Sequence, residues 1–272
     1  MIDALSHPAF VGRIAGIELR VAAAVLQGQP VTARDLAELE NNAGIHTTST
    51  ASLRAYAQQL LAAYEACTLI AEWPTTGPVY HLTGSGQDHV RRLTPNIPKI
   101  SALALEPYYV PPTKPTWIDA LTHKRILIVH PFVHTFQAQI EHLRAVHRRP
   151  WLEGCTFQFV RPPVTLGGQH RDQDWSVALQ PTLDALSQVE PFDVALVGAG
   201  GYGMLLSHHL YRTHPNSSVI YIGGALQLFF GVIGKRWFTQ PEVMALVTSK
   251  WVRPLPADRP VGWERVERGC YW

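Results

Sequence analysis

Six residues, Gly198-Ala199-Gly200-Gly201-Tyr202-Gly203, have the spacing G-x-G-x-x-G between an apolar run and a helical pattern. Glycines at these positions let the backbone turn tightly and approach a phosphate, and the start of the following helix supplies amide donors. We therefore predict that Gly198, Gly200, Gly201, Tyr202 and Gly203 bind the phosphate or sugar part of a ligand.

An NAD site needs one more residue, an acid about 20 positions further on that holds the ribose diol at the end of the next strand. The next strand-like run, residues 217–224, ends in Gly223-Gly224 and has no acid there. A site for S-adenosylmethionine generally needs a similar acid. The turn also follows the third strand of the C-terminal half, whereas the NAD turn normally follows the first. The sequence therefore disfavours both cofactors.

The pair Gly223-Gly224 also ends a strand and opens a helical segment, so two glycine turns are expected side by side. Together the two turns would present a surface of backbone amide groups suited to binding a diphosphate. The alternative is that the glycines only allow a helix to pack closely on the sheet. Gln227 is placed in the same nucleotide-binding set. Lys235 and Arg236 are expected at the end of this helix, where they either neutralise phosphate or bind the helix C-terminus.

A second candidate stretch is residues 10–19, FVGRIAGIEL, where an apolar run leads into a helix. Arg13, Gly16 and Glu18 follow the run and are expected to line a site at a strand end. Glu18 is also favoured near a helix N-terminus for electrostatic reasons alone, which is the structural alternative.

His130 and Glu106 are further candidates for catalysis, as acid or base or as substrate contacts. His130 ends the apolar run of residues 125–131, and Glu106 follows a strand-like run. His134 is four residues after His130, but Pro131 makes a shared helix, and therefore a zinc pair, improbable.

The elements that position these residues follow from hydrophobic periodicity. In the C-terminal half, buried-strand runs alternate with helical patterns, which predicts a Rossmann-like doubly wound parallel sheet of the α/β class. The strand runs are residues 125–131, 156–163, 193–200 and 217–224. In the mainly helical N-terminal part we expect helices at 17–27, 32–44 and 49–70 and a short strand near 101–110. The Pro-rich residues 111–117 suggest a division into 1–112 and 113–272, although one compact domain is also consistent.

Composition narrows the class of protein. The 272 residues are 46% hydrophobic and carry 23 basic and 21 acidic side chains. This size supports a substantial core, and the near-neutral charge argues against nucleic acid as the main partner. The three cysteines are sparse and lack metal-site spacing. No apolar run reaches the roughly 18 residues of a membrane span, and no signal peptide is evident, so a cytoplasmic location is expected. The oligomeric state is left open.

Three stretches together resemble a known family. They are GRIAGIEL near the N-terminus, FDVALVGAGGYGMLL at residues 192–206 and VIYIGGALQLFFGVIGKRW at 219–237. This arrangement resembles glycosyltransferase-like proteins of bacterial and viral polysaccharide gene clusters, which are distantly similar to glycosyltransferases with the GT-D type of fold. The last 22 residues look like the closing signature of the polysaccharide-cluster relatives. The resemblance covers the N-terminal turn and most of residues 190–272.

The resemblance implies transfer of a sugar from a nucleotide-diphosphate donor to a glycan or a related acceptor. It implies that the diphosphate binds at the glycine turns. In the GT-D group a D-x-E turn binds a divalent metal such as Mn²⁺ or Mg²⁺, and the matching positions here are Gly16-Ile17-Glu18. The glutamate is kept and the aspartate is replaced, so Glu18 is either a lone metal ligand or a base. Lys235, Arg236 or Arg13 would then offset the charge of the leaving diphosphate.

A second hypothesis belongs to a different class, a non-catalytic protein that binds sugar nucleotides or glycans and has lost its metal site. Gly16 in place of an acid favours binding only. Arg13, Glu18 and the pair Lys235-Arg236 favour retained catalysis.

Overall fold

The computed structural model describes residues 7–110, 113–147, 149–168 and 173–272. Within these residues the strands form one seven-stranded parallel sheet in the order β3-β2-β1-β7-β6-β4-β5. The chain has an α/β fold with a Rossmann-like doubly wound sheet, as the sequence predicted. The strands are β1 (Phe10–Arg13), β2 (Leu69–Glu72), β3 (Lys99–Ser101), β4 (Arg125–Val129), β5 (Thr156–Val160), β6 (Val194–Val197) and β7 (Ser218–Tyr221).

The strands are connected by α-helices and by short 3-10 segments. The α-helices are α1 (Ile17–Leu26), α2 (Ala33–Glu38), α3 (Thr50–Glu65), α4 (Pro78–Leu93), α5 (Val133–Gln139), α6 (Leu143–His147), α7 (Trp175–Leu186), α8 (Gly203–Thr213) and α9 (Pro241–Met244). A π-helix, η2, spans Leu39–Ala43. The 3-10 turns are η3 (Ala102–Leu105), η4 (Pro107–Tyr109), η5 (Trp117–Leu121), η6 (Ile140–His142), η7 (Gly200–Tyr202), η8 (Gly223–Phe230), η9 (Lys235–Trp237), η10 (Pro256–Asp258) and η11 (Trp263–Arg265).

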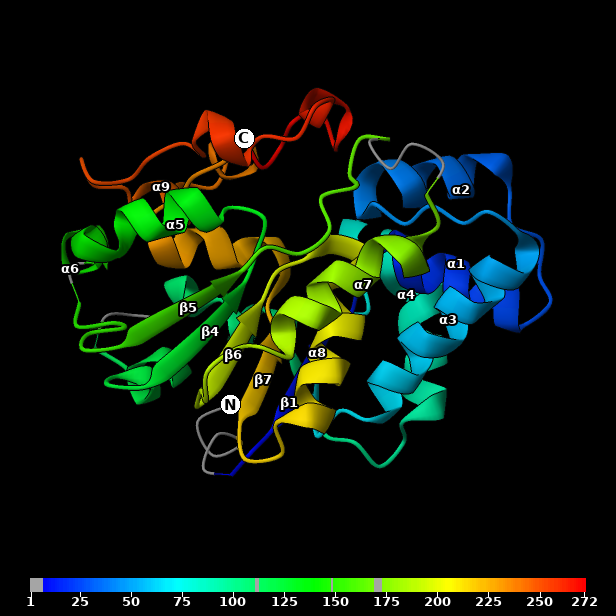
Figure 1. Ribbon diagram of the computed structural model, residues 1–272, viewed down its shortest axis with the longest axis horizontal. Coiled ribbons are helices and arrows are strands. Elements are labelled where there is room, and N and C mark those ends of the chain that lie inside the picture. The colour runs from blue at the N-terminus through cyan, green and yellow to red at the C-terminus, as the bar shows by residue number, and fades with distance from the viewer. Residues whose placement is uncertain (1–6, 111–112, 148, 169–172) are drawn as a thin grey trace.

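Each face of the sheet has its own core, because successive strand side chains point to opposite faces. In β4, Leu127 and Val129 join one buried cluster, whereas Ile126 and Ile128 join the other. Helices α1, α3, α7 and α8 cover the first face. The second face is covered by α5, α6, η5, η8 and the C-terminal segment, which Figure 1 shows in orange to red above the sheet. A parallel sheet needs cover on both faces, and the fully buried β1, β6 and β7 are its centre.

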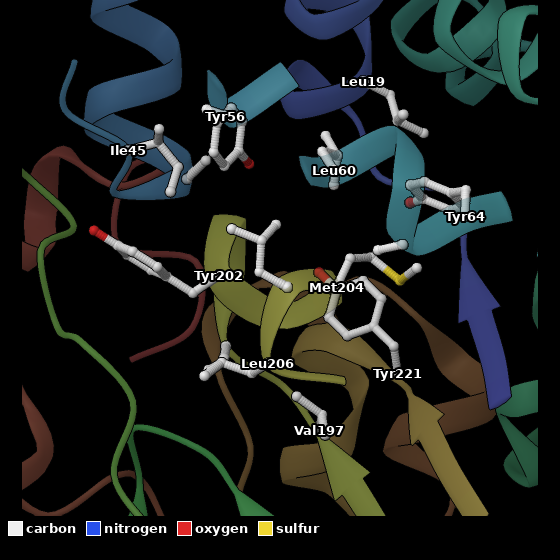
Figure 2. Packing of buried hydrophobic residues seen from close by; sticks show 14 of the residues in the cluster. Leu19, Ile45, Tyr56, Leu60, Tyr64, Val197, Tyr202, Met204, Leu206 and Tyr221 are labelled. Carbon is white, nitrogen blue, oxygen red and sulfur yellow. The ribbon is translucent and has the colours of Figure 1, made fainter. Parts of the chain in front are cut away.

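The first core joins the N-terminal helices to the C-terminal half. Leu60 and Tyr64 of α3 lie over Met204 of α8 and Tyr221 of β7, as Figure 2 shows. All four side chains are buried. Since α3 and α8 are far apart in the sequence, this packing fixes the turn after β1 relative to the glycine turn before α8.

Three expected elements differ from the structure. The helix expected over 49–70 ends at Glu65, and its last residues open strand β2. The strand expected near 101–110 is only Lys99–Ser101, followed by the 3-10 turns η3 and η4. The helix expected to reach Lys235-Arg236 ends at Phe230, because Gly231 adopts a left-handed conformation (φ 64°). Lys235 and Arg236 instead form η9.

The expected division into residues 1–112 and 113–272 stays a prediction. Residues 111–112, next to this boundary, lie outside the described residues. Strands from both sides of it share the sheet, since Phe10 of β1 pairs with Val219 of β7. Thr32 caps α2 in a capping box with Asp35. Among the described residues, no helix is both long enough and apolar enough to cross a bilayer.

Candidate functional site

A cavity of about 520 Å³ lies beyond the carboxyl ends of β1, β4, β6 and β7. Its size is within the roughly 300–1,000 Å³ of small-molecule sites. The segment after β1 leads to α1 on one face, and the segment after β7 leads to η8 on the other. Neighbouring strands whose connections leave to opposite faces form the crevice in which doubly wound sheets bind ligands.

The structure brings most of the residues singled out from the sequence to this cavity. Those that line it are Arg13, Gly16, Glu18, Glu106, His130, Gly198, Gly200, Gly223, Gly224, Gln227 and Arg236. Four others, Gly201, Tyr202, Gly203 and Lys235, are not part of its lining.

Gly201 and Gly203 face protein instead of ligand. A Cβ atom on Gly203 would lie 2.1 Å from Cε2 of Tyr221, and one on Gly201 would lie 2.4 Å from Cγ1 of Ile45. Tyr202 is buried, and its hydroxyl donates to the carbonyl of Gly44 at 3.2 Å. In this part of the motif the geometry agrees with the structural alternative, in which glycine allows α8 to pack closely on the sheet.

Gly203→Ala is expected to lower the free energy of unfolding by about 1–3 kcal/mol, because the new methyl group overpacks the contact between α8 and β7. Urea unfolding measures this change. Gly16→Ala is the matched control, since a Cβ there meets no atom within 4 Å. Equal stability of the two variants would show that Gly203 is not needed for packing.

Gly200 and Gly223 leave backbone exposed to the cavity, whereas Gly198 is buried. Gly223 has φ 73°, and a Cβ on it would meet no atom within 4 Å, so it borders open space. Gly198 lies close to Gly223, since a Cβ on Gly198 would be 2.6 Å from the carbonyl oxygen of Gly223. The two glycine turns are therefore in contact at the ends of β6 and β7, as the sequence predicted. The first N–H groups of a helix have no partner inside the helix, so the start of η8 can bind an anion.

Glu18 is in the first turn of α1 and lines the cavity. The turn that carries it is held by α3, because the Tyr64 hydroxyl donates to the Arg13 carbonyl (2.7 Å) and accepts from the Ala15 N–H (3.1 Å). The side chain is enclosed by protein but partly accessible through the cavity. Desolvation raises the pKa of Glu18, backbone hydrogen bonds oppose this, and the charges of Glu267 and Glu38 add to it. A carboxylate with a raised pKa is suited to general base catalysis.

Arg13 and Glu106 form a buried ion pair, with 9% of each side chain exposed. The second guanidinium NH₂ group of Arg13 donates to the Ile222 carbonyl at 2.6 Å, and Cζ lies 4.5 Å from the centre of the Trp73 ring. The Trp73 indole in turn donates to the Ile14 carbonyl at 3.0 Å. The Glu106 carboxylate is already bound to Arg13. Its geometry therefore favours a role in holding Arg13 in place, and not a role as a base that takes a proton from substrate.

His130 is buried, and burial lowers its pKa to about 3, although the Asp258 carboxylate acts in the opposite direction. The Phe132 N–H donates to His130 Nδ1 at 3.0 Å, so in the neutral ring the proton is assigned to Nε2. The ring also stacks on Phe136. A neutral imidazole with a protonated Nε2 is a hydrogen-bond donor and a weak base, which favours ligand contact for His130.

Arg236 is exposed at the cavity, with its guanidinium 5.0 Å from the Tyr271 ring and 5.4 Å from the Trp237 ring. Among the described residues no carboxylate lies within 4.0 Å of it, in contrast to Arg13 and Arg20, the other cations of the lining. Arg236 is therefore the lining cation best placed to meet an anionic ligand. Lys235 points elsewhere and lies over Trp263.

Sequence reasoning missed Glu267, which also lines the cavity. Glu267 and Arg268 have φ 44° and 59°, followed by Gly269 at 72°. A left-handed residue with a side chain costs about 1–2 kcal/mol, and such strain clusters at functional sites. No local pattern predicts this conformation, because glutamate and arginine rarely adopt it. Trp73 and Tyr271 were missed as well, since an aromatic residue in a sequence usually indicates core.

The ligand set does not fit a divalent metal. Among the described residues no group of three or more His, Cys, Asp or Glu side chains is arranged to hold an ion. Gly16 supplies no carboxylate beside Glu18, and Glu38 is paired with Arg20 at 2.9 Å. We therefore derive no step through a metal.

Comparison of the chain with protein-family models, with curated proteins and with solved structures found no match.

Proposed function

We propose that the chain is a glycosyltransferase that moves a sugar from a nucleotide-diphosphate donor to a hydroxyl group of a glycan or related acceptor. The observation that carries the proposal is that Glu18, a carboxylate with a raised pKa, lies in one cavity with two glycine turns in contact. A base beside an anion-binding surface is what glycosyl transfer from a sugar diphosphate needs.

In the proposed reaction the donor diphosphate lies on the turns at Gly198 and Gly223, with Arg236 beside it. The Glu18 carboxylate takes the proton of the acceptor hydroxyl, and the acceptor oxygen forms a bond to the anomeric carbon. The bond from that carbon to the diphosphate breaks, and the leaving group departs with the electron pair. His130 Nε2–H and the guanidinium of Arg236 are available to donate to the developing negative charge.

The alternative is a protein that binds a sugar nucleotide or glycan without catalysis. Two observations favour it. Glu106 is engaged by Arg13, and the lining residue Gly16 offers no second carboxylate next to Glu18. Both hypotheses place the same ligand in the same cavity. They differ only in whether the bound donor is turned over.

Ligand class is tested by thermal unfolding in the presence of UDP-, GDP- and TDP-sugars, with NAD and S-adenosylmethionine as comparisons. A ligand that binds only the folded state at about 100 times its Kd raises the melting temperature by about 5–10 °C. We expect this shift with one sugar nucleotide and not with the two cofactors. Stabilisation by NAD or S-adenosylmethionine instead would overturn the proposal.

A further inference from the structure

The rim of the cavity at the β2 and β3 end is apolar and exposed. Three side chains form this apolar rim, Val79 and Leu82 of α4 and Leu103 of η3. Between 39% and 57% of each is exposed, and all three line the cavity itself. Large exposed apolar side chains gathered at one site indicate a binding surface, whereas single ones need no explanation.

The sheet order separates the apolar rim from the glycine turns. α4 follows β2, and η3 follows β3, so the rim lies beyond the carboxyl ends of these two strands. The glycine turns follow β6 and β7, and β1 with Glu18 lies between the two ends. From β2 to β6 there are three strand spacings, or about 14 Å. A donor and an acceptor that together fill the cavity would therefore place a charged group at one end and an apolar group at the other.

We propose that the acceptor is an amphiphilic glycoside, with its sugar hydroxyl at Glu18 and its apolar aglycone on the apolar rim. This inference rests on the proposed function. The donor occupies the glycine end, where Arg236 and the start of η8 favour an anion. The acceptor enters from the opposite end, whose lining includes the three residues of the apolar rim together with Trp73 and Thr83. Tyr109 lies between the two ends, because its hydroxyl donates to Gln240 Oε1 at 3.0 Å and Gln240 donates to the Arg236 carbonyl.

A chain-length series of alkyl glucosides tests the proposal. Binding of methyl, hexyl and octyl β-glucoside to the full chain is measured by calorimetry below the concentration at which octyl glucoside forms micelles. A methylene moved fully from water into an apolar site tightens binding about fourfold, and partial burial gives about twofold. We expect octyl glucoside to bind at least tenfold more tightly than methyl glucoside.

Leu82→Ser and Leu103→Ser should each weaken octyl glucoside binding about three- to tenfold and leave methyl glucoside binding unchanged. Val177→Ser is the matched control, because Val177 is also on a helix and is 54% exposed, against 57% for Leu82, but lies outside the cavity. Affinity that does not depend on alkyl chain length, or an equal loss in Val177→Ser, would overturn the proposal.

Two further measurements separate the possible failures. Thermal shifts with sugar nucleotides should be the same in Leu82→Ser and in the wild type, because the donor end is distant. If no donor binds while the chain-length effect persists, the proposed function fails and the apolar rim stands as a binding surface for amphiphiles. Sedimentation tests a second copy of the chain as the occupant. A dimer that Leu82→Ser dissociates would overturn the acceptor assignment.

Discussion

Replacing Glu18 with glutamine is expected to lower the rate of sugar transfer by about 100- to 10,000-fold, the usual contribution of a general base. Glutamine keeps the size of the side chain but cannot take a proton. The fold should be retained, because burial raises the pKa of Glu18, which means that the folded state disfavours its charged form. At a pH above the pKa that Glu18 has in the unfolded chain, the charge on Glu18 destabilises the folded state. Glutamine removes this charge, so the free energy of unfolding at neutral pH should be unchanged or slightly higher.

Initial rates of nucleoside diphosphate release measure the effect. Glu65→Gln is the control, since Glu65 ends α3 on the surface and is not part of the cavity lining. A Glu18→Gln enzyme with wild-type rate would remove Glu18 from the mechanism. Loss of the fold in this variant, seen in unfolding curves, would instead show that Glu18 is structural.

The pH profile gives a separate prediction for Glu267. Desolvation raises the pKa of Glu18 first of all, and the Glu267 charge raises it further. The rate should therefore increase with pH as Glu18 loses its proton, at a pH above the ordinary range of glutamate. In Glu267→Gln this rising limb should move to lower pH, because a negative charge has been removed. The groups facing Glu18 that remain are Glu38, Tyr56, Tyr64 and Tyr221. A rising limb at the same pH in Glu267→Gln and in the wild type would contradict the electrostatic coupling between Glu267 and Glu18.

The second large effect is expected for Arg13→Gln, which should lower the free energy of unfolding by about 3–5 kcal/mol. The variant leaves the Glu106 carboxylate buried without its partner, and it also removes the contact with Trp73. Urea unfolding at neutral pH measures the change.

Two variants sharpen the test. Arg20→Gln breaks ion pairs whose side chains are 28–33% exposed, and such pairs contribute about 0–1 kcal/mol. Arg13→Met combined with Glu106→Leu removes both buried charges, and replacing a buried pair by apolar residues is often neutral. The double variant should recover most of the stability lost in Arg13→Gln. A loss no larger than that of Arg20→Gln would contradict the assignment of Arg13–Glu106 as a buried pair.

The sheet of the C-terminal half could be predicted because its strands are continuous apolar runs separated by helical patterns. The side-by-side glycine turns also followed from the sequence, and the pairing of Val197 with Tyr221 confirms that β6 and β7 are neighbours. β2 was not predicted, because Leu69–Glu72 continues the apolar spacing of the preceding helix. The insertion of β1 beside β7 depends on tertiary packing, since Phe10 and Val219 pair across more than 200 residues.

For the site, residues next to strand ends could be predicted and their roles could not. Arg13 ends β1, and Glu18 and His130 follow β1 and β4, so all three reach the cavity at the carboxyl edge of the parallel sheet. The motif G-x-G-x-x-G does not distinguish Gly198, which is part of the cavity lining, from Gly203, which packs on Tyr221. Glu267 comes from the C-terminal segment, whose path over the second face is determined by tertiary contacts such as those of the buried Trp272.

The most direct test of the central claim is release of nucleoside diphosphate from UDP-, GDP- and TDP-sugars by the wild-type chain and by Glu18→Gln. Octyl β-glucoside serves as acceptor, and each reaction is run with and without manganese. We expect the wild type to release the diphosphate from one donor and Glu18→Gln to lose this activity. Tight binding of a donor without release, either to water or to octyl β-glucoside, would contradict catalysis with this acceptor and support the binding protein. No binding of any donor would contradict the sugar-nucleotide site itself.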